Sequence, residues 1–169
     1  DRHILMLDVE KIVADIDPGS AIDNSNPEKI FDQKPIVVTA EDSGTIRKMI
    51  TERLKFAGFE IVSFNNGKEA WDYMADISNK VHNGANLKSL VNLVITDIEM
   101  PMMDGYSLTK NIKTDKILAN LPVVIFSSII SADVLHRGKS VGADAQLTKP
   151  QIGELLETVR TLMHQYQSI

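Results

Sequence analysis

The chain has 169 residues, a formal net charge of -5 at pH 7 and no cysteine. A chain of this length can bury a sizeable core, so no metal or disulfide is needed to explain its folding. The lack of cysteine excludes disulfides, thiolate catalysis and cysteine-ligated metal sites. The acidic balance argues against a nucleic-acid surface, and no apolar run approaches the roughly 20 residues that span a bilayer. We therefore expect a soluble, cytoplasmic protein without direct membrane insertion.

The first residues form two short pieces ahead of the main domain. Within residues 1–16, the run Ile4-Leu5-Met6-Leu7 predicts a short strand, and Asp8 can begin a brief helical stretch. Because this piece is too small for a core, we expect it to belong to a larger upstream unit. Residues 17–34 have the composition of a linker, being rich in Asp, Asn, Ser, Pro and Gly up to Pro27. The first residue is Asp1, which indicates a fragment or a processed product.

Strands and helices alternate through residues 35–169. Apolar, β-branched runs predict strands at residues 36–40, 59–64, 91–96, 123–126 and 145–148. Apolar residues at helical spacing predict helices around residues 46–57, 70–77, 108–112, 134–141 and 152–163. Five such alternations indicate a parallel sheet with right-handed crossovers and helices on both faces. We predict an α/β, flavodoxin-like, doubly wound five-stranded sheet of order 2-1-3-4-5.

Polar residues follow four of these strands at the point where each strand ends. They are Glu41-Asp42, Asp97, Ser127-Ser128 and Lys149. Because the carboxyl ends of parallel strands share one edge of a sheet, these groups are expected to converge there. Carboxylates so close would repel one another unless a cation lies among them, and Mg²⁺ held by few protein oxygens and water fits such a site.

This cluster suits phosphoryl transfer to a carboxylate. Beside Mg²⁺, Asp97 can attack a phosphoryl group and form an acyl phosphate, while Lys149 and the Ser127 hydroxyl hold phosphoryl oxygens. Taken singly, each residue has a simpler explanation. Acids and serines at strand ends commonly cap helices or form turns, and a lone lysine is commonly a solvated surface charge. Their joint occurrence at four strand ends favours the functional interpretation.

Residues from about Pro35 to Tyr166 resemble the receiver domain of two-component response regulators, which accept a phosphoryl group from a histidine kinase. The resemblance is carried by four motifs and their spacing: Glu41-Asp42, the segment from Asp97 through Met100-Pro101 to Asp104-Gly105, Ser127-Ser128, and Lys149-Pro150. It implies that Asp97 is the phosphoacceptor and that a cis bond before Pro150 places Lys149. It also implies a magnesium site formed by Asp42, Asp97 and the Glu99 main-chain carbonyl, with Glu41 assisting through water.

The segment from His3 to Ile12 resembles the tail of a CheW-like coupling domain. A CheW-like domain followed by a receiver is the plan of the CheV chemotaxis coupling proteins. This resemblance implies that CheA is the phosphodonor kinase and that chemoreceptors are contacted through the upstream domain. The receiver would then tune receptor–kinase coupling or act as a phosphate sink.

Three positions depart from the receiver pattern. Gln146 stands where the family often has an aromatic switch residue, which excludes signalling by an aromatic rotamer flip there. Residues 78–89 form a polar stretch that lengthens the segment before Asp97, and the added length is better suited to a surface loop than to an extra element. Glu99 places a carboxylate beside the phosphoryl site, where we expect it to change the dephosphorylation rate.

Two other functions remain open at this point. A haloacid-dehalogenase-like phosphatase also uses a strand-end aspartate with Mg²⁺, but its second acid is usually Asp where this chain has Glu99. A pseudo-receiver would keep the fold as an interaction module without phosphorylation. The direction of any effect on coupling and the oligomeric state are not predicted by these motifs.

Overall fold

The structure is a computed structural model that describes residues 34–129 and 131–167. The interpretations placed on residues 1–16, and nearly all of the 17–34 linker, lie outside these residues. The described part alternates strands and helices in the order β1 Ile36–Ala40, α2 Gly44–Phe56, β2 Glu60–Phe64, α3 Gly67–His82, η1 Leu87–Ser89, β3 Leu93–Thr96, α4 Gly105–Thr114, β4 Val123–Ser127, α5 Ala132–Ser140, β5 Ala145–Thr148 and α6 Ile152–Gln167.

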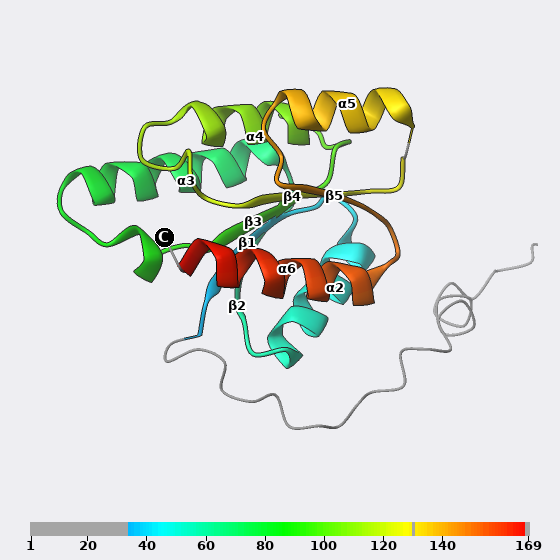
Figure 1. Ribbon diagram of the computed structural model, residues 1–169, viewed down its shortest axis with the longest axis horizontal. Coiled ribbons are helices and arrows are strands. Elements are labelled where there is room, and N and C mark those ends of the chain that lie inside the picture. The colour runs from blue at the N-terminus through cyan, green and yellow to red at the C-terminus, as the bar shows by residue number, and fades with distance from the viewer. Residues whose placement is uncertain (1–33, 130, 168–169) are drawn as a thin grey trace, which may run out of the picture.

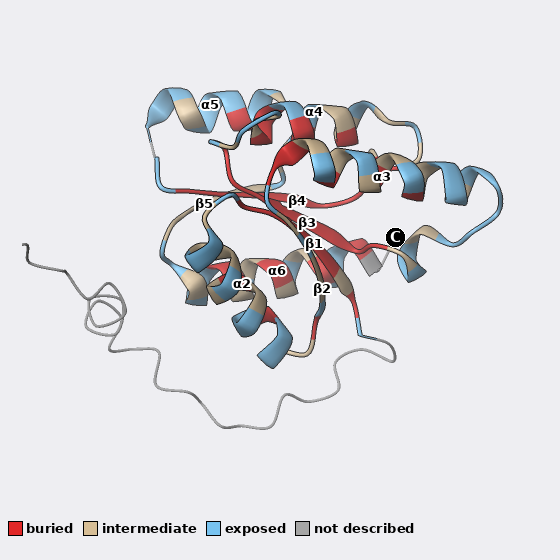
Figure 2. Ribbon diagram, turned by 180° about the vertical axis from the view of Figure 1, so that it is seen from behind, coloured by how far each residue is buried: buried red, intermediate tan, exposed pale blue. Residues whose placement is uncertain are grey.

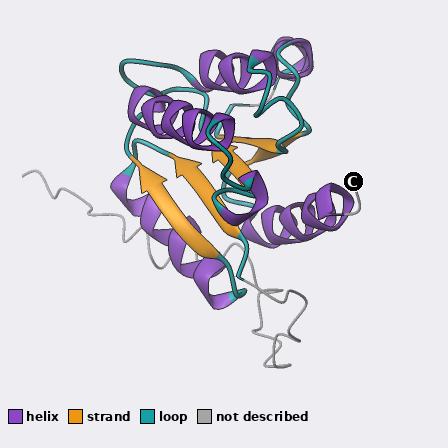
Figure 3. Ribbon diagram, turned by 90° about the vertical axis from the view of Figure 1, so that its left-hand side faces the viewer, coloured by secondary structure: helices purple, strands orange, loops and turns teal. Residues whose placement is uncertain are grey.

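The strands form one parallel sheet of order β2-β1-β3-β4-β5, which confirms the predicted fold. Helices α3, α4 and α5 lie on one face of the sheet and α2 and α6 on the other (Figure 1). Figure 3 shows the strands side by side between these two layers. This arrangement explains the sequence of the central strands, because a strand covered on both faces needs apolar residues throughout. Every residue of β3 and β4 is buried.

The core is divided between the two faces of the sheet. One cluster joins β1 and β3 to α3 and α4, and the other joins β3 and β4 to α2 and α6. Buried residues accordingly follow the strands and the sheet-facing sides of the helices, while the outer helix faces are exposed (Figure 2). Successive side chains of a strand point to opposite faces, so the neighbours Leu93 and Val94 belong to different clusters.

Side-chain caps begin four of the helices that follow the strands. The side chains of Ser43, Asn66, Asp104 and Ser131 each accept a hydrogen bond from the main-chain N–H three residues later. Such caps satisfy N–H groups that have no partner within the helix. The connections after β1 and β2 are short, and Gly105 N–H donates to Ile98 O at 2.9 Å, so these helices begin close to the carboxyl edge of the sheet.

The predicted loop at residues 78–89 was wrong. Helix α3 continues to His82, and residues 87–89 form a short 3-10 helix. Val81, Leu87 and Leu90 pack against the core, and the Lys88 ammonium lies 5.4 Å from the centroid of the Tyr166 ring. These apolar residues are spaced among polar ones, so composition alone favoured a loop. The segment is an extension of the folded domain.

The segment around η1 also closes the amino edge of the sheet. Ile36 N–H donates to Asn92 Oδ1 at 2.7 Å, and Asn92 Nδ2 donates to the Lys88 carbonyl at 2.8 Å. The start of β1 is thereby tied to the residues that precede β3. Within the described residues, no helix has both the length and the apolar character needed to cross a membrane.

Candidate functional site

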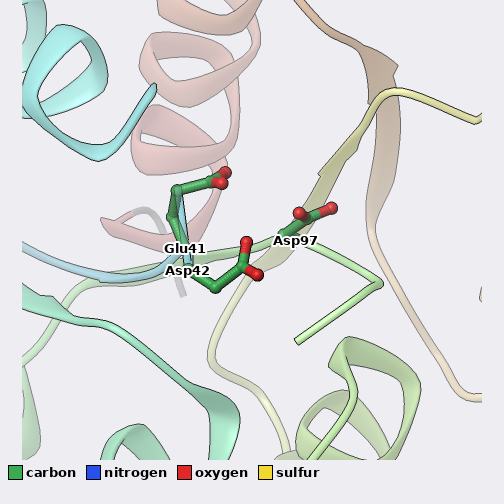
Figure 4. A group of neighbouring side chains, drawn as sticks. All are labelled: Glu41, Asp42 and Asp97. Atoms are coloured by element: carbon green, nitrogen blue, oxygen red, sulfur yellow. The ribbon is translucent and has the colours of Figure 1, made fainter. Parts of the chain in front are cut away.

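Three predicted carboxylates meet at the carboxyl edge of the sheet. Glu41 and Asp42 follow β1, Asp97 follows β3, and one carboxylate oxygen from each lies within 4.8 Å of the others (Figure 4). Glu41 is 2% and Asp97 8% exposed, whereas Asp42 faces solvent. The group is therefore buried on two sides and open at Asp42.

The strand register explains why these residues meet. Ala40 of β1 lies opposite Thr96 of β3, so the next residue of each chain segment leaves the sheet at the same level. Asp97 N–H donates to the Ala40 carbonyl at 2.9 Å, and Glu41 N–H donates to Phe64 O at 3.1 Å. These bonds continue the sheet ladder through the two acids and fix their main chain.

Lys149 supplies the positive charge of this cluster. Its Nζ lies 2.6 Å from Glu41 Oε2 and 2.8 Å from Asp97 Oδ2, and its side chain is largely buried. Lys149 N–H donates to Ser127 O at 3.0 Å, which anchors the end of β5 to that of β4. The Lys149–Pro150 peptide bond is cis, as the resemblance implied. Three carboxylates thus face a single ammonium, which leaves net negative charge at the edge.

Each buried carboxylate also accepts a main-chain hydrogen bond. Asp97 Oδ1 accepts from Ile98 N–H at 2.6 Å, and Glu41 Oε1 accepts from Ser43 N–H at 3.2 Å. Burial raises the pKa of Glu41 above its ordinary value, and the hydrogen bond and charge of Lys149 oppose that rise. A further cation at this site would therefore stabilise the charged form of Glu41.

Ser127 and Glu99 flank the cluster. Ser127 is buried at the end of β4, and its Oγ accepts from Ile129 N–H at 3.3 Å, so its own O–H proton is available to a further acceptor. Glu99 lies two residues after Asp97 with an exposed side chain. No contact of the Glu99 carbonyl is among those found in residues 34–129 and 131–167, so its role as a metal ligand stays a prediction.

Two residues at this edge were missed as parts of the site. A Cβ on Gly105 would lie 1.9 Å from Asp97 O, so only glycine permits this close approach behind the acid. The Arg47 guanidinium donates from Nη1 to Glu41 O at 2.6 Å and to Asp42 O at 3.2 Å. The available signals were the glycine that follows Asp104 and a cation in the first turn after the acid pair.

The donor set fits a hard divalent cation. Carboxylate oxygens from two strand ends converge, one of the carboxylates is open to water, and the negative charge exceeds that of the single lysine. Mg²⁺ commonly binds through one or two carboxylates while it keeps several waters. The same lysine and serine can hold the oxygens of a phosphoryl group beside Asp97.

Comparison with known families settles the class of protein. The family model described as the response regulator receiver domain matches residues 37–160. The chain belongs to the response regulator receiver family. The strand order and the acidic cluster at the strand ends agree with this assignment. A receiver is a signalling domain rather than a metabolic enzyme.

Curated relatives link this receiver to chemotaxis. Chemotaxis protein CheV2 of Helicobacter pylori is 33% identical over 164 residues, which span 95% of this chain and 50% of that protein. CheV3 of the same organism is 28% identical over 163 residues, spanning 96% of this chain and 52% of that protein. The chain therefore spans about half the length of these relatives.

A solved structure agrees with this assignment. Vibrio cholerae CheY4, a chemotaxis response regulator, is 27% identical, covers 77% of this chain and 99% of its own, and superimposes with a TM-score of 0.63.

The receiver also has a polar contact at the position of Gln146. Gln146 Nε2 donates to Leu135 O of α5 at 2.8 Å, and Gln146 Oε1 is buried without a hydrogen-bond partner among the described residues. A Cβ on Gly138 would lie 2.1 Å from that oxygen, so the carboxamide occupies the space that glycine leaves on α5. A polar contact with α5 stands where the family often has an aromatic ring.

Proposed function

We propose that this receiver accepts a phosphoryl group on Asp97 from the histidine kinase CheA, in a Mg²⁺-dependent reaction, within a CheV-type chemotaxis coupling protein. The observation that carries the proposal is the placement of Asp97. Its carboxylate is held by Lys149 Nζ at 2.8 Å and lies within 4.8 Å of the acid pair. This combination offers a fixed nucleophile, a neighbouring cation and oxygen donors for a metal.

The residues of the chain divide the work of transfer. A carboxylate oxygen of Asp97 forms the new P–O bond as the P–N bond to the kinase histidine breaks. The electron pair of that bond stays on the ring nitrogen, and the imidazole leaves neutral because its other nitrogen is protonated before transfer. The Ile98 N–H and Lys149 orient the Asp97 carboxylate before attack. The Ser127 hydroxyl donates to one phosphoryl oxygen, and the Lys149 ammonium pairs with a second phosphoryl oxygen.

Asp42, Asp97 and the Glu99 main-chain carbonyl would hold Mg²⁺, with Glu41 assisting through water. When bound, the metal supplies positive charge that offsets the charge on the phosphoryl oxygens. Glu41 is suited to the indirect role, because its side chain is buried and less open to a solvated ion than that of Asp42. Asp42 is suited to direct ligation, because its carboxylate faces solvent.

The relatives support a place in chemotactic signalling. In the proposed arrangement, residues 1–16 are the tail of a CheW-like domain, residues 17–34 are a linker, and residues 35–169 are the receiver. The upstream domain would contact chemoreceptors and CheA, and phosphorylation of Asp97 would modulate their coupling or draw phosphoryl groups away from other acceptors. The 33% identity to a CheV protein across 95% of the chain supports this plan.

Intact mass spectrometry tests the chemistry. The chain is incubated with acetyl phosphate, with and without Mg²⁺, beside an Asp97→Asn variant. The expected result is one Mg²⁺-dependent phosphoryl adduct that hydrolyses slowly and is absent from the variant. No adduct with acetyl phosphate or with phosphorylated CheA would instead identify a pseudo-receiver, and continuous turnover of a phosphate ester would identify a phosphatase.

A further inference from the structure

Arg47 contacts the main chain of the acid pair from the first turn of α2. Its Nη1 donates to Glu41 O at 2.6 Å and to Asp42 O at 3.2 Å, and the side chain is half-buried. Lys149 forms the ion pairs with Glu41 and Asp97, so the two cations have different tasks. Lys149 contacts carboxylate oxygens, whereas Arg47 contacts peptide oxygens.

These bonds close a small ring around residues 41–47. Ser43 N–H donates to Glu41 Oε1 at 3.2 Å, Arg47 N–H donates to Ser43 O at 2.9 Å, and Arg47 Nη1 returns to Glu41 O. The ring leaves the acid pair little freedom to turn about its main-chain dihedrals. The side chain that completes the ring is long enough for one nitrogen, Arg47 Nη1, to reach two successive carbonyls.

Asp42 depends on this ring for its position. Among residues 34–129 and 131–167, no hydrogen bond to the Asp42 carboxylate is found, and Arg47 is the residue whose side chain bonds its main chain. An exposed carboxylate without side-chain partners is oriented through its own backbone. We infer that Arg47 is a positioning residue for the magnesium site, which presents Asp42 to the metal by fixing the peptide oxygens of the acid pair. This inference rests on the proposed function, because it concerns the same metal.

The sign of the effect separates this role from simple electrostatics. Removing a positive charge beside carboxylates strengthens cation binding, because the local potential becomes more negative. Removing a group that positions a ligand weakens cation binding, and loss of such an outer contact typically costs 10–100-fold in metal affinity. Arg47→Met removes both the charge and the donors while it keeps the aliphatic stem. A weaker Mg²⁺ affinity in this variant therefore reports positioning.

The test is a titration of the ¹⁵N-labelled chain with Mg²⁺, followed through the backbone amide signals of the acid pair and Asp97. We expect the Mg²⁺ dissociation constant of Arg47→Met to rise by about tenfold. Lys48→Met is the matched control, because Lys48 is the exposed next residue of α2 and its removal changes the net charge equally. The control should bind Mg²⁺ as tightly as the parent chain, or more tightly.

Arg47→Lys gives a second reading with no change of charge. A lysine side chain is shorter and holds its ammonium farther from the two carbonyls, so we expect the dissociation constant to lie between those of the parent and Arg47→Met. The same spectra report whether each variant keeps its fold. Arg47→Met that is folded and binds Mg²⁺ as tightly as the parent overturns the inference alone. A parent chain that binds no Mg²⁺ overturns both the inference and the proposed metal chemistry.

Discussion

Gly138→Ala tests whether the Gln146 carboxamide fastens α5 to the sheet. In a helix interior this change ordinarily stabilises a protein by up to about 1 kcal/mol, because alanine has the higher helix propensity. Here the new Cβ would lie 2.1 Å from Gln146 Oε1 and 2.6 Å from Nε2, far inside normal contact. The carboxamide must leave, and its bond to Leu135 O is lost.

The magnitude follows from these two terms. The lost hydrogen bond is worth about 1 kcal/mol, and displacement of the flexible end of Gln146 adds little. We expect Gly138→Ala to leave the free energy of unfolding of the parent chain nearly unchanged, because the gain in helix propensity offsets this loss. In a Gln146→Ala background the clash is absent, and the same change should raise it by up to about 1 kcal/mol.

Urea unfolding followed by far-ultraviolet circular dichroism measures all four members of this cycle. The expected coupling energy is about 1 kcal/mol, which is within the range for neighbouring residues in contact. Gly153→Ala in α6 serves as a control, because no atom lies within 4 Å of its Cβ position. Equal effects of Gly138→Ala in the two backgrounds would refute the contact between Gln146 and α5 as described.

Three further predictions concern the acid cluster. Lys149→Met should lower the free energy of unfolding by about 2–3 kcal/mol, which is less than the loss of a fully buried partner because Asp42 leaves the site open to water. Mg²⁺ should raise the midpoint of thermal unfolding more in this variant than in an exposed Lys110→Met control, and equal Mg²⁺ responses would contradict this. Gly105→Ala should cost about 1–3 kcal/mol and slow acetyl phosphate labelling of Asp97, since its Cβ would lie 1.9 Å from Asp97 O; unchanged labelling and stability would show that the loop adapts freely. Glu99→Ala should change the lifetime of the Asp97 phosphoryl group, measured by the decay of the mass adduct, and an unaltered lifetime would remove Glu99 from the hydrolytic step.

The fold and the acid cluster were predictable because both depend on short-range patterns. Apolar runs that end abruptly in Glu41, Asp97 or Lys149 identify a strand and its carboxyl end together, and the parallel topology then brings those ends to one edge. The register adds the remaining detail, since Ala40 opposite Thr96 sets the two acids level.

Other features depend on side-chain reach and on packing between distant elements. Arg47 acts on the acid pair only because its side chain turns back along α2, which its position in the sequence does not indicate. Ser78, Asn79 and Lys80 make the end of α3 polar, yet Val81 packs against the core one turn after Ile77. The Gln146 contact requires α5 to lie over β5, and neither segment alone predicts that distance.

The start of β1 has a consequence for how a signal would travel. The main chain enters the described domain at Lys34 and Pro35, and Asn92 fastens that entrance to the amino edge of the sheet. The acid cluster lies at the opposite end of the same strand, six residue steps or about 20 Å away. A structural change at Asp97 could therefore affect the chain entrance at Pro35 only along the length of the sheet, and it could otherwise be detected only by a partner that binds the outer surface of the domain.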